Sequence, residues 1–230
     1  MNTKRYTPNM LSEYDMLRIV IPSYDKLQDQ LAGQILKHFK NSNIKIIDVG
    51  CGSGLTSLAI MKKLPNADIT LIDNDKSMIK RAKERCGQKL QYICCDALEY
   101  LKSIPNQTVD CFASGLLLHG FTKNTRSNYI SEAFRITTTG GLFVNADKYV
   151  RDNTTLQKKD FKSHINCFRK LKDLANQELV NQWTRHCLRD MNENIIMRLD
   201  DALNELETVG YKNLVEAYRK NIFAVVMAEK

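Results

Sequence analysis

The segment from Asn43 to Ile60, NIKIIDVGCGSGLTSLAI, constrains the fold more than any other part of this sequence. A short apolar run ends in three glycines at alternate positions, Gly50, Gly52 and Gly54, and apolar residues then resume with helical spacing. A strand that passes through such a turn into a helix places backbone N–H groups and the positive end of the helix dipole at one edge of a sheet. Because glycine has no Cβ, a ligand can approach the main chain closely there. The turn therefore predicts a ligand-binding α/β fold, and a tight turn with packing glycines is the alternative.

Further short apolar runs follow along the chain, separated by segments long enough for a helix. We predict strands at residues 45–49, 69–72, 90–94, 109–114 and 141–146. The alternation of strands and helices predicts a parallel sheet with right-handed crossovers. A C-terminal antiparallel hairpin is expected from residues 212–218 and 222–228, which makes seven strands with helices on both faces.

Two helices have recognisable ends. In SNYISEAFRITTTGG, Tyr129, Ile130, Ala133 and Phe134 fall on one face, and the pair Gly140-Gly141 should end the helix. In LDDALNELETVGY, leucines 199, 203 and 206 repeat this pattern before Gly210. An N-terminal helix is expected to bury Leu27, Leu31, Ile35 and Leu36.

The length of 230 residues and a hydrophobic content of 43% suit one domain over residues 1–230 with a single core. Within it we expect an N-terminal helical cap at 1–40 and a cofactor-binding core at 41–150. Residues 152–195 form a helical insertion, and residues 196–230 hold the last helix and the hairpin. An insertion this long is more typical of a lid or a dimer arm than of a loop.

Composition argues against several classes of protein. The seven cysteines are scattered without a CxxC pair and the histidines number four, so we expect reduced thiols, no metal site and a cytoplasmic location. The net charge of +8 permits nucleic acid as a partner, but lysine and arginine are spread along the whole chain. The N-terminus lacks the apolar segment of a signal peptide, and no apolar run approaches the roughly 18 residues that span a bilayer. No contact with a membrane is expected.

Acidic residues after the second and third predicted strands indicate a nucleoside ligand. A dinucleotide G-x-G-x-x-G fingerprint would need glycine where Leu55 stands. Asp73, at the end of the second strand, could accept hydrogen bonds from both ribose hydroxyls, whereas Asp75 is the better N-cap for the next helix. Asp96 and Ala97 suit an adenine amino group and ring edge, and a helix cap is the alternative for Asp96.

Five motifs together resemble the class I S-adenosylmethionine-dependent methyltransferases: DVGCGSG (48–54), LIDNDKSMI (71–79), CDALEYL (95–101), VDCFASGLLLHGF (109–121) and EAFRITTTGGLFVNAD (132–147). The resemblance implies a Rossmann-like fold, S-adenosylmethionine as cofactor, S-adenosylhomocysteine as product, and in-line transfer from the sulfonium. The cofactor-binding residues that it implies are Asp48, Gly50, Cys51, Gly52, Gly54, Asp73, Asn74, Met78, Asp96, Ala97 and Ser114.

The acceptor is less well indicated. His119, just after the fourth strand, is a candidate general base, and shaping the pocket or capping a helix is the alternative. Tyr14, Tyr24, Lys148 and Tyr149 are further candidates for contact with the acceptor. The segment after the fourth strand lacks the D/N-P-P-Y/F signature that the resemblance would require for methylation of adenine in nucleic acid. A small-molecule acceptor is therefore favoured over nucleic acid.

Two further segments resemble the bacterial carboxy-S-adenosylmethionine synthases of tRNA wobble-uridine modification: RIVIPSYDKLQDQLAGQIL (18–36) and LRDMNENII (188–196). That family holds the extra carboxylate with an arginine of the late helices, and the resemblance places Arg189 there. A surface pair with Glu193 is the alternative. The pair Gly52-Ser53 departs from that family, which has Ser-Leu at this point of the turn.

Three functions follow as alternatives. The first is a methyltransferase that acts on a small metabolite beneath the helical insertion. The second is a carboxy-S-adenosylmethionine synthase-like or tRNA-modification enzyme, which would hold a carboxylated cofactor or bind RNA in a salt-sensitive way. The third is a non-catalytic protein that only binds adenosylmethionine. The second resemblance also implies a homodimer formed through the helices of residues 152–195.

Overall fold

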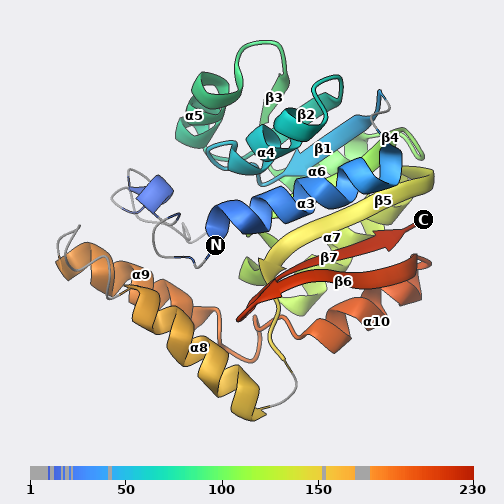
Figure 1. Cartoon of the computed structure of the whole chain (residues 1–230). Helices are drawn as coiled ribbons and strands as arrows, with labels where there is room; N and C mark the ends of the chain where they lie inside the picture. Colours follow the sequence, from blue (N-terminus) through green and yellow to red (C-terminus); the bar gives the residue numbers. More distant parts are fainter. Residues whose placement is uncertain are drawn as a thin grey trace.

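The computed structural model describes residues 10, 13–16, 18, 21, 23–40, 43–151, 154–168 and 177–230. Seven strands form one sheet in the order β3-β2-β1-β4-β5-β7-β6 (Figure 1). The strands are parallel to their neighbours except β7, which runs antiparallel to both β5 and β6. Their bounds are β1 Lys45–Val49, β2 Asp68–Asp73, β3 Gln91–Cys94, β4 Val109–Gly115, β5 Thr137–Lys148, β6 Lys212–Lys220 and β7 Phe223–Glu229. The predicted seven-stranded, mostly parallel sheet with a C-terminal hairpin is confirmed.

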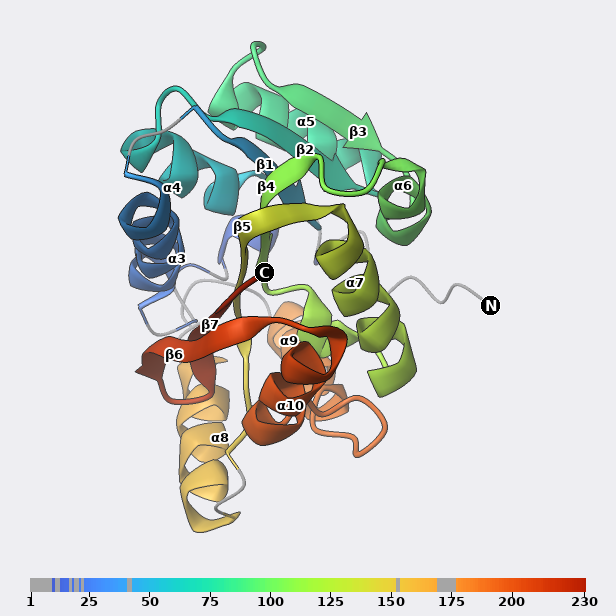
Figure 2. The ribbon, with the colours of Figure 1, turned by 90° about the vertical axis from the view of Figure 1, so that its right-hand side faces the viewer.

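Helices cover both faces of the sheet, as the two views show (Figures 1 and 2). Side chains of α3, α4 and α5 belong to the apolar core on one face, and those of α6, α7 and α10 to the core on the other. Helices α8 and α9 lie side by side at the end of the sheet where β5 finishes (Figure 1). The bounds are η1 Tyr14–Met16, α3 Tyr24–Phe39, α4 Leu55–Lys63, α5 Lys76–Cys86, α6 Ala97–Ser103, η2 Leu118–Gly120, α7 Lys123–Ile136, α8 Thr154–Phe168, α9 Gln177–Arg189 and α10 Leu199–Val209.

Helix α3 shows why the sequence pattern was informative. Leu27, Leu31 and Ile35 recur every four residues and are buried completely or almost so, while Leu36 is partly buried against the same core. Each such leucine or isoleucine stabilises the fold by about 1.5 to 3 kcal/mol through burial. The apolar face of α3 therefore packs on β5 and β7 and against α4, the helix that follows the glycine turn.

The junction between α7 and β5 differs from the sequence prediction. We expected Gly140 and Gly141 to end the helix, but α7 ends at Ile136 and β5 begins at the next residue. The Thr137 hydroxyl donates to the Ala133 carbonyl at 2.6 Å, which closes the last helical turn. Three consecutive β-branched threonines then favour extended backbone, so the strand starts earlier than predicted.

The structure also bears on the composition-based expectations. All seven cysteines are free thiols. Among the residues that the structure describes, no helix combines the length and the apolar character needed to cross a membrane.

Candidate functional site

The glycine turn lies at the carboxyl ends of β1, β2 and β4. Gly50, Gly52 and Gly54 all have positive φ, at +68°, +52° and +83°, which other residues rarely adopt. A Cβ on Gly50 would lie 2.6 Å from the end of the Leu117 side chain, which can move, so the positive φ is the stronger reason for glycine there. At Gly52 the nearest atoms to a Cβ belong to the Tyr14 ring, at 3.7 Å. The Tyr14 ring therefore lies over Gly52, at ordinary contact distance from the position a Cβ would take.

Asp73 fixes this turn from the end of β2. Its Oδ2 accepts from the Gly52 N–H and its Oδ1 from the Asp75 N–H, each at 2.9 Å. Burial raises the pKa of Asp73 despite these bonds. The carboxylate thus lies beside the turn, as predicted, and its contact with a ribose stays a prediction. Asp75 caps α5 by accepting from Ser77 and Met78 N–H groups, which confirms its predicted role.

Two other residues implied in cofactor binding are buried within the sheet. Asp48 and Ser114 have no exposed surface, and Asp48 accepts from the Ser57 hydroxyl at 2.5 Å. Burial raises the pKa of Asp48 to about 7. Within the described part of the chain, Asp48 Oδ1 and Ser114 Oγ have no hydrogen-bond partner, which leaves two polar atoms available beneath the turn. Cys51 is also buried, and burial raises the pKa of its thiol.

The residues expected near the adenine differ in their burial and in the contacts they make. Asp96 caps α6, since its Oδ1 accepts from the Glu99 N–H at 3.1 Å, so the structure gives it the alternative role. Ala97 is the first residue of that helix and is partly buried. Asn74 is exposed in the loop after β2, and Met78 is buried in α5.

A polar contact fastens η1 to the glycine turn. Asp15 accepts from the Ser53 hydroxyl at 2.7 Å and from Arg85 at 2.6 Å, and Arg85 also donates to the Ser53 carbonyl. Burial alone would raise the pKa of Asp15, but Ser53 and Arg85 outweigh burial and lower it. Sequence reasoning missed this contact because Asp15 and Arg85 are 70 positions apart. Its effect is to place Tyr14 over the turn.

A group of buried polar side chains lies where β4 and β5 end against α8 and α9. We call it the histidine cluster; its members are His119, Asp147, Lys148, His164, His186, Cys187 and Asp190. Three of the chain's four histidines belong to it. Polar groups at this depth are stable only when they are paired, so the cluster is a specific feature of this core.

His119 and Asp147 form the inner half of the cluster. His119 Nδ1 contacts Asp147 Oδ1, and Asp147 Oδ2 accepts from the Leu118 N–H at 2.8 Å. Burial alone would raise the pKa of Asp147, but His119 and backbone amides outweigh it and hold this pKa below its usual range. With Nδ1 against Asp147, the Nε2 atom of His119 is directed at Asp190, 3.4 Å away.

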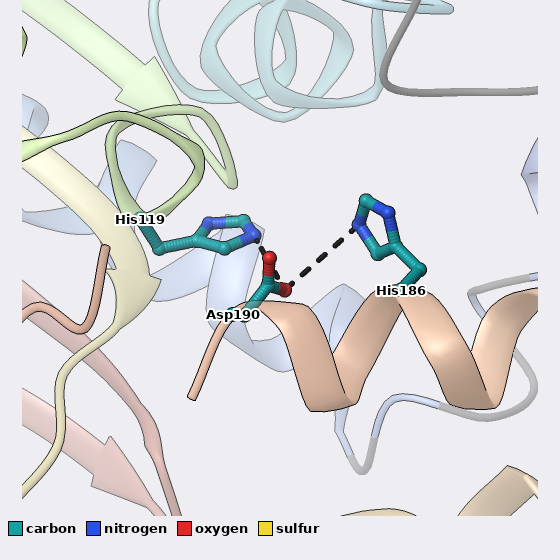
Figure 3. A group of neighbouring side chains, drawn as sticks. All are labelled: His119, His186 and Asp190. Carbon is teal, nitrogen blue, oxygen red and sulfur yellow. Dashed lines mark ion pairs between the residues drawn. The ribbon is translucent and has the colours of Figure 1, made fainter. Parts of the chain in front are cut away.

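Helix α9 and Asp190, the residue directly after it, supply the outer half. His186 and Asp190 are four residues apart and face His119, which comes from η2 (Figure 3). Asp190 Oδ2 lies 2.6 Å from the Lys148 ammonium and 3.8 Å from His186 Nε2. The Asp190 carboxylate therefore lies between one lysine and two histidines.

Cys187 and His164 complete the cluster and join it to two small cavities. His164 Nε2 lies 3.2 Å from Cys187 Sγ, and burial lowers the pKa of His164 well below its usual value. One cavity, of about 20 Å³, is lined by Tyr14, Leu116, Trp183 and part of the cluster. The other, of about 10 Å³, shares His119, Lys148, His164 and Cys187 and adds Asp190. The cluster thus lines two narrow spaces, each with room for about one water molecule, so a larger ligand would need side chains to move.

The structure brings together some of the predicted acceptor residues. Tyr14, His119 and Lys148 line the cavities. Tyr149 does not, because neighbouring residues of an extended chain point to opposite faces; its hydroxyl accepts from Asn145 Nδ2 at 2.8 Å in the other core. Tyr24 is buried in the core beneath α3 and lines neither cavity.

Arg189 is exposed on α9, outside the histidine cluster. Glu193, the partner considered for it, pairs instead with Arg198 at 3.2 Å. The pairing of Glu193 with Arg198 does not bear out the surface pair, and the contact of Arg189 with a carboxylated cofactor stays a prediction.

Sequence reasoning did not identify His164, His186, Cys187 or Asp190. The available signal was the i, i+4 spacing of His186 and Asp190, which places both on one side of a helix. Nothing in the sequence shows that this side meets His119, because packing between distant elements decides that.

Residues 46–141 match the family model described as "Methyltransferase domain". The structure is similar to an S-adenosylmethionine-dependent methyltransferase from Archaeoglobus fulgidus, with a TM-score of 0.64 and 12% identity over 94% of this chain and 99% of that one. The chain has the class I methyltransferase fold. It is also similar to an O-methyltransferase family protein from Burkholderia thailandensis, with a TM-score of 0.66 and 14% identity over 95% of this chain but only 58% of that one.

Similarity over nearly the whole sequence is found with carboxy-S-adenosyl-L-methionine synthases. The protein from Nautilia profundicola is 27% identical over 226 residues, which cover 94% of this chain and 89% of the relative. That from Campylobacter hominis is 25% identical over 98% of this chain and 94% of the relative. Taken together, these matches make the chain an S-adenosylmethionine-dependent enzyme of the methyltransferase superfamily.

Proposed function

We propose that the protein converts S-adenosylmethionine into a carboxylated S-adenosylmethionine, the product for which its full-length relatives are named. In this reaction the methyl carbon loses a proton and bonds to the carboxyl carbon of a donor, while the donor's own bond to that carbon breaks and the rest of the donor takes up the proton. The extent of the similarity carries this proposal. It includes α3 and the helices α8 and α9 as well as the core of residues 46–141 that methyltransferase domains have in common. Those additions supply Trp183, His186 and Cys187, which line the cavity beside the cluster.

The glycine turn fits the adenosylmethionine. Gly52 presents its main chain without a side chain, Asp73 lies beside it for the ribose, and Ser114 Oγ and Asp48 Oδ1 are polar atoms in need of partners. When bound, adenosylmethionine supplies an activated sulfonium methyl group. The chain's own residues would hold it at the turn, and Tyr14 and Trp183 line the neighbouring cavity.

A carboxyl donor needs a cationic site in the same enclosure, and Lys148 supports this role. Its ammonium is almost completely buried and contacts Asp190, so it already neutralises one carboxylate at this position. A donor carboxylate would share or replace that contact in a charge-assisted hydrogen bond. The proposal therefore assigns carboxylate recognition to Lys148, where the sequence had suggested Arg189.

Mass spectrometry of the small molecules released from purified, denatured protein tests this function. We expect a species heavier than adenosylmethionine by one carbon dioxide. Lys148→Met should lose this species and keep adenosylmethionine, because the glycine turn is unchanged. Lys102→Met is the matched control, since Lys102 is exposed and pairs with Glu99 on the same helix. Adenosylmethionine or adenosylhomocysteine as the sole species, even after incubation with cell metabolites, would contradict the proposal.

Methyl transfer to a small acceptor is the second candidate, and the contact of His119 with Asp147 favours it. A carboxylate behind the imidazole stabilises the charged ring that forms when Nε2 takes a proton from an acceptor. The Gly52-Ser53 pair of the turn is also the one that ordinary methyltransferases carry. Its test is adenosylhomocysteine formation with a panel of phenols, amines and thiols. Asp147→Asn should lower turnover by about a hundredfold or more while adenosylhomocysteine affinity is unchanged.

A further inference from the structure

We propose that His119, His186 and Asp190 form a binding site for one divalent transition-metal ion, for which zinc is the most suitable probe. Each residue offers one ligand atom, and these three atoms lie within 4.8 Å of one another (Figure 3). All three side chains are buried. Two imidazoles and one carboxylate are a donor set that zinc and neighbouring transition metals accept.

The spacing of these atoms suits an ion better than hydrogen bonds. Asp190 Oδ2 lies 3.4 Å from His119 Nε2 and 3.8 Å from His186 Nε2, beyond the usual 2.7 to 3.2 Å of N–H···O bonds. Two ligands of a tetrahedral zinc ion, at about 2.0 to 2.1 Å from the metal, are about 3.3 Å apart. Small side-chain movements would therefore bring the three atoms to ligand distances.

Asp147 supplies the support that metal-binding histidines need. Its carboxylate contacts His119 Nδ1 and is itself held by backbone N–H groups of Leu118 and His119. A carboxylate on the second ring nitrogen orients the imidazole and makes the first nitrogen a better ligand. His119 is thus presented to Asp190 and His186 by a rigid element.

Lys148 competes for the same carboxylate. Its ammonium lies 2.6 Å from Asp190 Oδ2 and 3.9 Å from Cys187 Sγ. A metal ion must displace this ammonium, since two cations cannot share one carboxylate oxygen without repulsion. Removing the lysine should therefore strengthen metal binding, an effect opposite in sign to the loss of a ligand.

The site would extend the chemistry of the pocket whichever group is transferred. Three protein ligands leave a four-coordinate ion one position for a water molecule or a substrate oxygen. The cavities beside the cluster, of about 20 and 10 Å³, have room for a water molecule at that position. A metal ion bound to His119 Nε2 prevents this nitrogen from acting as a base. The test below therefore measures zinc binding itself and not enzyme activity.

The experiment is a titration of the purified full-length protein, after treatment with a chelator, with zinc in competition with a chromophoric chelator. We expect one equivalent to bind. His186→Gln should bind zinc at least tenfold more weakly, because it loses a ligand, whereas Lys148→Met should bind it more tightly. His38→Gln is the control, since His38 lies on α3 against the Gly140 carbonyl and away from the cluster. Thermal melts establish that each variant is folded.

Cobalt(II) in place of zinc identifies the ligands. We expect visible d–d absorption without a sulfur-to-cobalt charge-transfer band, because Cys187 is a neighbour and not a ligand in this assignment. Absence of stoichiometric zinc binding would overturn the proposal, as would unchanged affinity in His186→Gln. A thiolate charge-transfer band would also overturn it, since the ion would then sit on cysteine.

Discussion

Asp73→Ala tests both the architecture of the glycine turn and the placement of the ribose. The side chain accepts two backbone N–H groups, from Gly52 and Asp75, each at 2.9 Å. Leaving a buried donor without an acceptor costs about 1 to 3 kcal/mol. Gly52 is only partly buried, so water can replace part of the loss, and we expect a total destabilisation of about 2 to 4 kcal/mol. This is less than the 5 to 15 kcal/mol of a typical domain, so the variant should fold.

Binding should fall for two reasons that act together. The ribose hydroxyls lose an ionised acceptor, and the Gly52 backbone loses the bond that holds its N–H in place. We expect adenosylhomocysteine to bind at least tenfold more weakly, which corresponds to about 1.4 kcal/mol. Isothermal titration calorimetry measures the affinity, and urea unfolding measures the stability.

Asp75→Ala is the matched control, because it removes a carboxylate two positions along without touching the turn. Asp75 accepts from Ser77 and Met78 N–H groups, so its loss should cost about 0.5 to 2 kcal/mol of stability through the missing helix cap. Its affinity for adenosylhomocysteine should match that of the unaltered protein. Unchanged affinity in Asp73→Ala, or an equal loss in Asp75→Ala, would show that the ribose lies elsewhere.

Two further predictions concern stability. Burial raises the pKa of Asp48 to about 7, above the value of about 4 in an unfolded chain. Between pH 4 and pH 7, roughly, the folded protein therefore binds more protons than the unfolded chain, and its stability should fall as the pH rises through this range. Asp48→Asn should flatten this decline in urea unfolding measured from pH 5 to 8, and an identical slope would contradict the assignment. In Gly210→Ala, alanine must adopt a positive φ of +111°, and a left-handed backbone costs a residue with a side chain about 1 to 2 kcal/mol. The new Cβ would also lie 2.9 Å from the Phe134 ring, so the total loss of stability should be larger than this backbone cost. Gly140→Ala isolates the backbone cost, since φ is +78° there and nothing lies within 4 Å; equal losses in the two variants would exclude the ring contact.

The cofactor side of the molecule could be predicted because its signals are local. A strand, a turn with glycines at 50, 52 and 54, and a helix follow one another within the segment quoted first. Asp73 was found because the carboxyl ends of parallel strands meet at one edge of a sheet, and the register pairs Val49 of β1 with Ile72 of β2. The junction at Thr137 was mispredicted because the two glycines are a typical helix end, whereas the β-branched residues before them favour extended backbone and start the strand earlier.

The histidine cluster was decided by tertiary structure alone. His119 and Asp147 are 28 positions apart, and Lys148 and Asp190 are 42 positions apart. Each residue looks ordinary in its own segment, and Arg189 looked more functional than its neighbour Asp190. A helix fixes which residues share a face, but only packing against the sheet decides which face is buried. The sequence thus determined a class I fold and a glycine turn with Asp73 beside it, while the folding of α9 onto the ends of β4 and β5 brought the histidine cluster together.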